Sequence, residues 1–501
     1  MPKEARDNSG YRIHSVKYNL LMNIILKASA VVFPLITFPY TVRTLESEAY
    51  GRVGFAISVV SYFALVASLG IPSYAVRKCA QKRDDPLGLA KTVKEILIIN
   101  TVSLCITYVA FIIGILFVPK LREDSTIMMI NSLSIILQTF GVEWFYQAIE
   151  QYDYITVRNI IVKIISILLL FIFVKTPEDI IPYSIVTIAG TVGSNILNFL
   201  RLPKLVNLKP RYELNIRQHL KPIFVLFFYY AATTIYTNLD VVMLGFLTDN
   251  SMVGYYNASV KLKNVLVSVI TALGAVALPR ASYYLSSKEH EKFKDLIRTS
   301  LNLVLLLSLG FAAYFTIEAK PVMLLLAGEG YVDSIQSMKW ITPSIVFIGI
   351  GSITAWQLLI PLGRDKCTLI GAVVGAIVDF GVNWLLIPRY GAAGASIGTL
   401  CAEMCVVIVH VIGLRDIIND FLEIHNIIKI FVGVLLSIVA LIGFNELVRL
   451  DSIFLTCVST ALIFFIIYGI TELVLKERTV LKGIGYLKIK LSNGKGKGRY
   501  N

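Results

Sequence analysis

Charged residues, and acidic residues above all, are scarce in this sequence. Only 16% of its 501 residues are charged, with 33 Asp and Glu against 47 Lys and Arg, whereas 56% are hydrophobic and the mean hydropathy is +0.71. This scarcity of charge excludes a soluble globular protein and indicates an integral membrane protein. The polar segments between the hydrophobic runs are short, so we expect no separate domain that could hold an enzyme active site.

Cysteine is also rare, and familiar catalytic motifs are lacking. All six cysteines fall in hydrophobic runs or in loops expected on the inner side, so we expect no disulfide. The pair Cys401 and Cys405 is interpreted as small packing residues rather than as metal ligands. Without a GxxxxGK[ST] loop or an Asp-x-Asp motif, neither ATP hydrolysis nor metal-dependent sugar transfer is expected. We therefore predict no catalytic residue, no metal and no cofactor.

Long hydrophobic runs dominate what is present. A bilayer core about 30 Å thick requires roughly 20 apolar residues of helix, and the sequence contains fourteen candidate runs. The ninth is the least regular, because the segment that follows it resembles a short re-entrant or interfacial piece. The candidate spans are 19–41, 51–71, 95–118, 126–147, 155–174, 180–202, 221–246, 253–279, 299–318, 336–360, 367–388, 392–413, 427–447 and 452–475.

Lys and Arg are concentrated on alternate polar segments. The N-terminal tail, the segments 72–95, 201–221 and 280–298, and the C-terminal tail carry most of them. Because cytoplasmic loops carry the excess of Lys and Arg, both termini are predicted to be cytoplasmic. The net charge of +14 is then an orientation signal and an attraction to anionic lipid, and nucleic-acid binding is not expected. The polar N-terminal tail predicts no signal peptide.

Weak internal similarity indicates two repeats. "EAYGRVGFA" corresponds to "MVGYYNASV", which aligns Gly51 with Gly254, and Gln147 corresponds to Gln357. Six spans per repeat is an even number, so both halves enter the membrane from the same side, as in some transporters. We predict an all-α membrane protein with two pseudo-symmetric six-helix lobes and a final helix pair. The predicted parts are an N-terminal tail over 1–18, an N-lobe over 19–208, a C-lobe over 209–420, a helix pair over 421–475 and a basic tail over 476–501.

Several cations lie within or next to the predicted spans. Lys27 follows Asn23 by one helical turn, and the two form part of a polar stripe on the first span. Lys27 either faces a wet cavity or extends towards the inner surface, and the sequence leaves both interpretations open. Arg43 and Arg52 flank the first outer loop, where they either line a vestibule or form paired interfacial charges.

The eighth predicted span has a clearer polar stripe. Asn257, Lys261 and Asn264 recur at helical spacing, while Lys263 points to the opposite side, so Lys261 is the favoured cavity residue.

On the seventh span, Thr237 and Asp240 form another polar face. Asp240 is either a counter-ion for a cavity lysine or part of a buried structural pair. Asp379 is central in its span, where it either serves as an ion or proton site or holds helices together.

A cavity lined by lysine, asparagine, threonine and tyrosine favours a substrate that is anionic and rich in hydroxyl groups, because a lysine in a dry site attracts phosphate strongly.

Seven segments in order resemble one transporter family. They are "FPYTVRTLESEAYG", "LGIPSYAVRKCAQKRDD", "EWFYQAIEQYDYITVRNIIVKI", "IYTNLDVVMLG", "VGYYNASVKL", "ALPRAS" and "NWLLIPRYGAAGASIGTLCAE". Together they resemble the Wzx-type polysaccharide repeat-unit flippases of the multidrug, oligosaccharidyl-lipid and polysaccharide exporter superfamily. The resemblance extends from about Tyr18 to Leu475. The chain departs from the family pattern at Ala148 and at Glu46, where many relatives have glycine.

The resemblance implies movement of an undecaprenyl-pyrophosphate-linked oligosaccharide from the inner to the outer leaflet of a bacterial cytoplasmic membrane. A two-lobed fold with a basic cavity would receive the pyrophosphate and sugar, and alternating access would release them for surface polysaccharide synthesis. Carried onto this chain, the cavity cations are Lys27, Arg43, Arg52 and Lys261. An H⁺ or Na⁺ gradient is the implied driver, and polysaccharide polymerase machinery is an implied partner. The final helix pair would form a groove for the lipid tail.

Two alternatives remain from the sequence. An ion-coupled drug antiporter of the same superfamily would usually have twelve spans and an acidic cavity, whereas the polar stripes here contain lysine. A membrane glycan polymerase would require a large outer loop.

Overall fold

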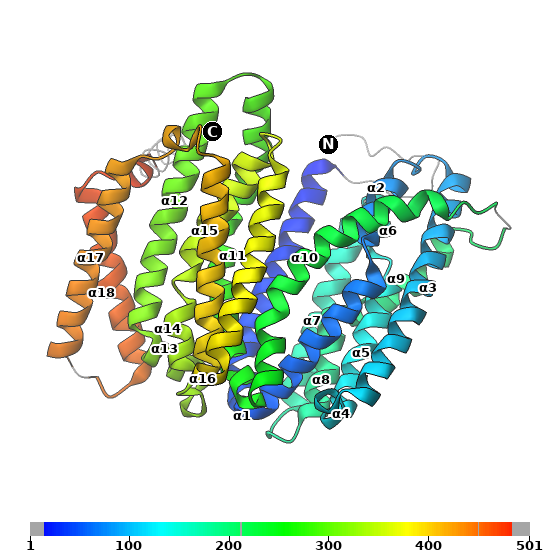
Figure 1. Ribbon diagram of the computed structural model, residues 1–501, viewed down its shortest axis with the longest axis horizontal. Coiled ribbons are helices and arrows are strands. Elements are labelled where there is room, and N and C mark those ends of the chain that lie inside the picture. The colour runs from blue at the N-terminus through cyan, green and yellow to red at the C-terminus, as the bar shows by residue number, and fades with distance from the viewer. Residues whose placement is uncertain (1–14, 211–212, 449, 483–501) are drawn as a thin grey trace, which may run out of the picture. The chain divides into compact units, whose positions relative to one another are not determined.

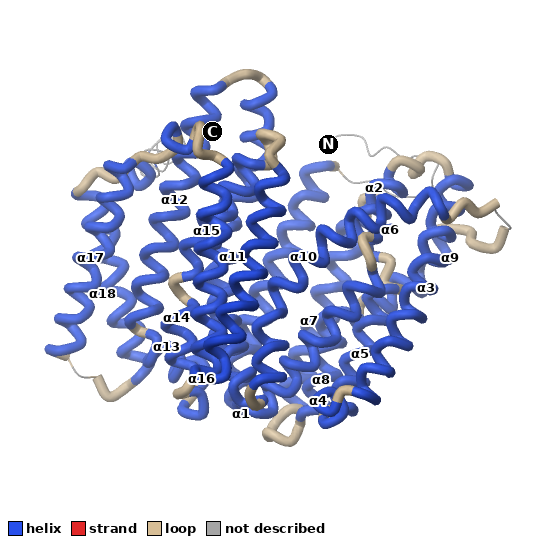
Figure 2. Tube along the Cα trace, in the orientation of Figure 1, coloured by secondary structure: helices blue, strands red, loops and turns tan. Residues whose placement is uncertain are grey.

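The computed structural model describes residues 15–210, 213–448 and 450–482 of the chain. Within these residues every regular element is a helix (Figures 1 and 2), which confirms the predicted all-α class. Helices satisfy their backbone groups internally, so a chain this apolar can cross a bilayer in this form. Most of the predicted N-terminal tail, and the basic tail after residue 482, lie outside the described residues.

The chain divides into two compact units, Met1–Asn257 and Ala258–Asn501, and α11 continues from the first into the second. The predicted domain boundaries remain a prediction. The first unit contains α1 (Val16–Ser68), α2 (Ile71–Ala80), α3 (Pro86–Phe117), α4 (Pro119–Glu123), α5 (Ser125–Thr139), α6 (Glu143–Ala148), α7 (Tyr152–Phe173), α8 (Ile180–Ile188), η1 (Ala189–Gly193), α9 (Asn195–Leu205), α10 (Arg217–Leu247) and the start of α11 (Asn250–Ser286). The second contains the rest of α11, α12 (His290–Ile317), α13 (Ala319–Ala327), η2 (Glu329–Tyr331), α14 (Ser334–Ile341), α15 (Ser344–Ile353), η3 (Thr354–Leu359), α16 (Asp365–Gly413), η4 (Ile418–Asp420), α17 (Ile424–Leu447) and α18 (Ile453–Val474).

Two helices are too long for a single membrane crossing. α1 has 53 residues and α16 has 49, and helices of that length extend over roughly 75–80 Å, more than twice the thickness of a bilayer core. Each is interrupted by one residue with non-helical torsion angles, Glu46 in α1 and Gly391 in α16. Each therefore joins two of the predicted spans through a tight reversal instead of a loop.

The described residues contain ten helices that are long and apolar enough to cross a membrane, or eleven when the bent α10 is included. α10 bends by 50° between Phe228 and Thr233. The sixth and tenth predicted spans each contain a π-helical turn, η1 and η3 respectively. The irregular ninth region is resolved into α12 followed by the separate short helix α13. The chain is a multi-pass membrane protein, and the number fourteen remains a prediction.

The two departures from the family pattern have different structural outcomes. Glu46 has φ 59° and ψ 178°, a backbone conformation that only glycine adopts readily, so a family glycine at this position has a physical basis. Ala148, in contrast, is buried at the end of α6 with helical geometry. The nearby turn is made by Glu150, whose φ is 58°.

A buried polar triad holds the start of α10 against α3 in the first unit. His219 Nε2 lies 2.7 Å from Glu95 Oε2, and Tyr74 Oη lies 2.6 Å from His219 Nδ1. The backbone N–H of Asn215 also donates to Glu95 over 2.6 Å. All three triad side chains are buried. Because each buried polar group has a partner, the triad connects these helices without leaving a desolvated charge unpaired.

In the second unit, the final helix pair packs against α12. α17 and α18 lie side by side (Figure 1, orange and red) and contact one another extensively. Tyr468 of α18 donates to Leu306 O over 2.8 Å, and Tyr314 of α12 donates to Cys457 O over 3.0 Å. The pair is thus connected to α12 by two hydrogen bonds, one donated by α18 and one donated by α12.

Candidate functional site

The predicted polar stripe on the first half of α1 is partly exposed and partly buried against the protein. Lys27 is exposed and Asn23 is half-buried, as a cavity or surface role requires. Asn19, one turn earlier, is buried and donates to Glu150 Oε2 over 3.2 Å, so it faces the protein. Arg43, near the other end of this half, is exposed. The cavity role of Lys27 and Arg43 remains a prediction.

Arg52 has a specific protein partner. Its Nε donates to Asp124 Oδ1 over 2.7 Å, and its Nη2 contacts the same oxygen. Asp124 is buried at the junction of α4 and α5, whereas the Arg52 side chain is 33% exposed. Of the two interpretations, the ion pair is therefore realised, with Asp124 as the partner. A role for Arg52 in substrate binding would use its exposed part and remains a prediction.

The predicted polar face of α10 meets the beginning of α11. Asp240 is buried and accepts a hydrogen bond from the buried Tyr256 hydroxyl. Thr237, one turn before it, is exposed. Asn257 is half-buried and packs directly on Gly54, where an added Cβ would lie 2.1 Å from the Asn257 amide nitrogen. Tyr256 is thus a neighbour of Asp240 that sequence reasoning had not assigned.

Three further predicted residues lie in the second unit. Lys261 is half-buried and Asn264 is exposed on α11. Asp379 is buried on α16, and an added Cβ at Gly398 would lie 3.2 Å from Asp379 Oδ1 and 2.1 Å from Asn383 Oδ1. The small residue Gly398 therefore leaves room for two polar side chains on the other half of the same broken helix. Their roles in binding or coupling remain predictions.

The structure adds cations that the sequence analysis did not select. Arg158, on α7, is buried, with Nη2 3.6 Å from Glu143 Oε2 and its guanidinium 5.7 Å from the Tyr154 ring centre. The guanidinium of Arg201 also lies over this ring, 4.0 Å from the Tyr154 ring centre. Lys163 donates to Ser29 over 3.1 Å. The signal that could have identified this cluster is the spacing of Tyr154 and Arg158, one helical turn apart.

A long apolar groove runs along α12 in the second unit, with a volume of about 680 Å³. Its α12 residues extend from Leu301 to Ile317, a rise of about 24 Å at 1.5 Å per residue. α17 contributes one regular face, and α15, α16 and η3 complete the wall. The α17 residues are Ile427, Phe431, Val434 and Ile438. Among the described residues, none that lines the groove is charged.

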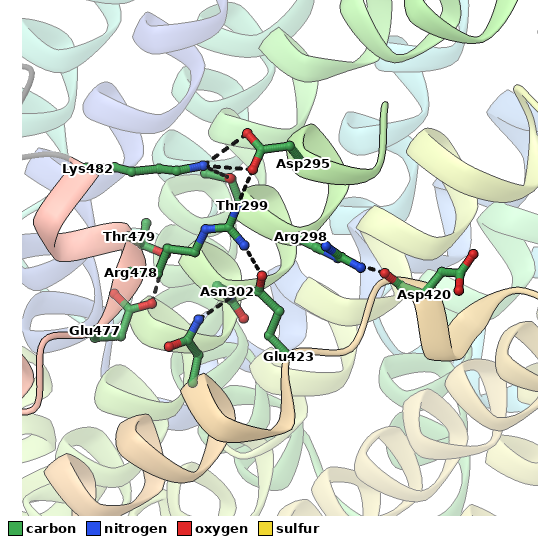
Figure 3. Close-up of polar contacts among 11 residues, drawn as sticks. Asp295, Arg298, Thr299, Asn302, Asp420, Glu423, Glu477, Arg478, Thr479 and Lys482 are labelled. Carbon is green, nitrogen blue, oxygen red and sulfur yellow. Dashed lines mark hydrogen bonds and ion pairs between the residues drawn. The ribbon is translucent and has the colours of Figure 1, made fainter. Parts of the chain in front are cut away.

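A charged cluster (Figure 3) includes residues next in the chain to two of the residues that line this groove. Arg478, just after α18, forms ion pairs with Asp295 of α12 and with Glu423, which precedes α17. Asn302 donates to Glu423 over 2.6 Å, and Lys482 donates to Asp295 over 3.0 Å. Asn302 and Glu423 directly follow groove residues Leu301 and Leu422. The cluster therefore connects the residue before α17 and the segment after α18 to α12, next to the groove.

Replacing Arg478 with alanine should loosen this connection. Arg478 bridges two carboxylates, and Glu423 is only 17% exposed, so its loss should cost on the order of 1 kcal/mol, near the upper limit for exposed ion pairs. We expect the midpoint of thermal unfolding in detergent to fall by a few degrees, as measured by the loss of monodisperse protein on heating. Arg389→Ala, a change at an exposed arginine on α16, is the matched control and should leave the midpoint unchanged.

Curated relatives match most of the chain. It is 25% identical over 400 residues to the "Putative O-antigen transporter" of Shigella dysenteriae, covering 78% of this chain and 98% of that protein. The protein of the same name from Escherichia coli strain K12 is 24% identical, covering 78% and 95%. A "Probable low-salt glycan biosynthesis flippase" of Haloferax volcanii is 22% identical over 237 residues, covering 43% of this chain and 47% of that protein.

Solved structures share the fold. The lipid II flippase MurJ in an inward closed conformation has a TM-score of 0.72 at 17% identity, covering 91% of this chain and 98% of that one. An inward-facing multidrug resistance MATE transporter has a TM-score of 0.60 at 14% identity, covering 81% and 99%. The family described as "Polysaccharide biosynthesis protein" matches residues 16–285, more than half of the chain. On this match, the chain belongs to the polysaccharide biosynthesis protein family.

Proposed function

We propose that the protein is a flippase that moves an undecaprenyl-pyrophosphate-linked oligosaccharide from the inner to the outer leaflet of a bacterial cytoplasmic membrane. The cargo would serve the synthesis of a surface polysaccharide such as capsule, exopolysaccharide or O-antigen. Support comes from the family, from relatives named as transporters and flippases, and from the fold shared with a lipid II flippase. The observation that carries the proposal is the apolar groove along α12.

The groove fits the lipid part of such a cargo. Its length of about 24 Å along α12 approaches the thickness of a bilayer core, so an extended polyprenyl chain could lie in it without leaving the membrane. The lining is apolar, and burying apolar surface gains about 25 cal/mol per Å² relative to water, although much less relative to lipid. The groove therefore provides a defined position for the tail rather than a strong affinity.

The polar part of the cargo would be held elsewhere, by the predicted cavity residues. The cations Lys27, Arg43, Arg52 and Lys261 would attract the pyrophosphate, with Asn23, Asn257, Asn264 and Thr237 beside them. Asp240 and Asp379 are the candidates for coupling to an H⁺ or Na⁺ gradient. Alternating access of two lobes would then carry the head group across.

The distribution of Lys and Arg supports an orientation with both termini in the cytoplasm. This orientation would present the binding site to a precursor assembled at the inner leaflet. Polysaccharide polymerase machinery on the outer side would be the partner that takes over the product.

Narrowing the groove tests the proposal directly. Val346 lines the groove from α15, and Val346→Phe should fill part of it while keeping it apolar. We expect a strain that depends on this variant to lose at least tenfold in surface polysaccharide and to retain lipid-linked precursor in the inner leaflet. Both quantities would be measured at matched amounts of membrane-inserted protein.

The same substitution at Val439, on α17 but outside the groove lining and 67% exposed, is the control and should leave export unchanged. If a strain with Val346→Phe exports normally, the groove does not take part in transport. Failure of the unmodified protein to restore export to a strain that lacks its own copy would refute the flippase itself.

A further inference from the structure

A second, chemically different pocket lies within the first unit. It has a volume of about 530 Å³ and is lined by the second half of α1, α5, α8 with η1, and α10. Serine, threonine and amide residues line it from all four of these elements, among them Ser61, Ser134, Gln138 and Thr191. Among the residues that the structure describes, none that lines this pocket carries a charge. Its polarity therefore comes from hydroxyl and amide groups alone.

Three hydroxyl groups of this pocket, those of Ser61, Ser134 and Thr191, are placed to accept hydrogen bonds from an incoming ligand. Ser61 donates to Ser58 O over 2.7 Å, and Ser134 donates to Asn131 O over 2.6 Å. Thr191 likewise donates to Thr187 O over 2.8 Å. A hydroxyl has one proton and two acceptor positions, so a hydroxyl that donates to its own helix can only accept from a ligand. The pocket thus presents oxygen acceptors from α1, α5 and η1.

Three further features of this pocket are typical of binding sites. η1 is a π-helical turn, and such turns, which carry a cost in backbone geometry, occur frequently at functional sites. It brings Thr191 into the lining. Gln138, an exposed residue at the end of α5, adds an amide that can both donate and accept. The volume is in the range of small-molecule sites and far exceeds the space that a bare ion requires.

We propose that this pocket binds a neutral, hydroxyl-rich sugar of the oligosaccharide cargo. A sugar ring supplies many O–H donors, which the acceptor oxygens require, and its uncharged state suits a lining without charge. Pyrophosphate, in contrast, has acceptor oxygens, which would meet the acceptor oxygens of Ser61, Ser134 and Thr191. The pocket would therefore select the saccharide and leave the pyrophosphate to cationic residues. This inference rests on the proposed function, because it assigns part of the same cargo to a separate site.

The test measures sugar binding rather than export. The probe is the lipid-free repeat-unit oligosaccharide prepared from the surface polysaccharide of the source organism, added to purified protein and followed by saturation-transfer NMR. We expect Thr191→Val and Gln138→Leu each to weaken binding about tenfold, the effect of losing one well-formed hydrogen bond. Inorganic pyrophosphate should not compete with the oligosaccharide for the pocket.

Thr101→Val is the matched control, because Thr101 is an exposed helical threonine that donates to Leu97 O over 2.8 Å outside the pocket. It should bind as the unmodified protein does. Absence of oligosaccharide binding, unchanged binding by the two pocket variants, or competition by pyrophosphate would each overturn the inference. If one of these results is found but the unmodified protein restores export, the inference about the pocket fails and the proposed flippase function stands. Failure of the pocket inference can therefore be told apart from failure of the proposed function.

Discussion

Replacing Gly254 with alanine is expected to prevent stable folding of the first unit. An added Cβ at Gly254 would lie 2.0 Å from Ser47 O, and one at Gly51 would lie 1.8 Å from Asn250 O. Both obstacles are backbone atoms, which cannot move aside as a flexible side chain can. Overpacking of a well-packed site typically costs 1–3 kcal/mol, and a backbone overlap at this distance should cost about 3 kcal/mol or more.

The measurement is the yield of monodisperse protein after membrane extraction, together with its thermal unfolding midpoint. Gly51→Ala and Gly254→Ala should each reduce both sharply. Gly443→Ala is the control, because a Cβ there would meet nothing within 4 Å, and the change, near the end of α17, should stabilise the helix by up to about 1 kcal/mol. A Gly254→Ala protein with normal yield and midpoint would show that α1 and α11 do not pack as closely as the structure places them.

Removal of either of the two lysines proposed for the pyrophosphate should strongly reduce export without loss of protein. Lys27→Ala and Lys261→Ala each remove one cation that is not required for packing, since Lys27 is exposed and Lys261 half-buried. A hydrogen bond to a charged group is worth about 1.5–3 kcal/mol, so each change should reduce export roughly 10- to 100-fold. Surface polysaccharide and precursor retained in the inner leaflet would be measured in a strain that lacks the chromosomal copy.

Lys263→Ala is the control for the second lysine, because the helical spacing directs Lys263 to the opposite side of α11 from Lys261. Lys27→Arg and Lys261→Arg should each export more than the alanine variant at the same position, since the charge is kept while the geometry changes. If both alanine variants export normally, these lysines do not bind the pyrophosphate. They would then be side chains that only extend towards the membrane surface.

Much of the architecture could be predicted because it follows from local patterns. Apolar runs of sufficient length must form helices in a bilayer, whatever their neighbours, so the helical class and most span positions were accessible from the sequence. The correspondence of Gly51 and Gly254, noticed as a repeat, also has a structural meaning, because both glycines allow α1 and α11 to approach closely. The family pattern at Glu46 likewise corresponded to a backbone conformation that favours glycine.

The partners of polar side chains could not be predicted in the same way. The sequence named no partner for Arg52, which pairs with Asp124, 72 residues further along the chain. Spacing reveals which residues share a helix face, but not which helix that face meets. For the same reason Tyr256 was not foreseen as the neighbour of Asp240.

The sequence by itself determined that this is a multi-pass helical membrane protein with basic residues concentrated on alternate loops, because hydropathy and charge act on each segment independently. Only the tertiary structure decided where the groove along α12 and the hydroxyl-lined pocket in the first unit lie. Each is formed by helices that are distant in the chain. Their positions depend on how side chains of different helices pack together, and periodicity along one helix contains no information about that packing.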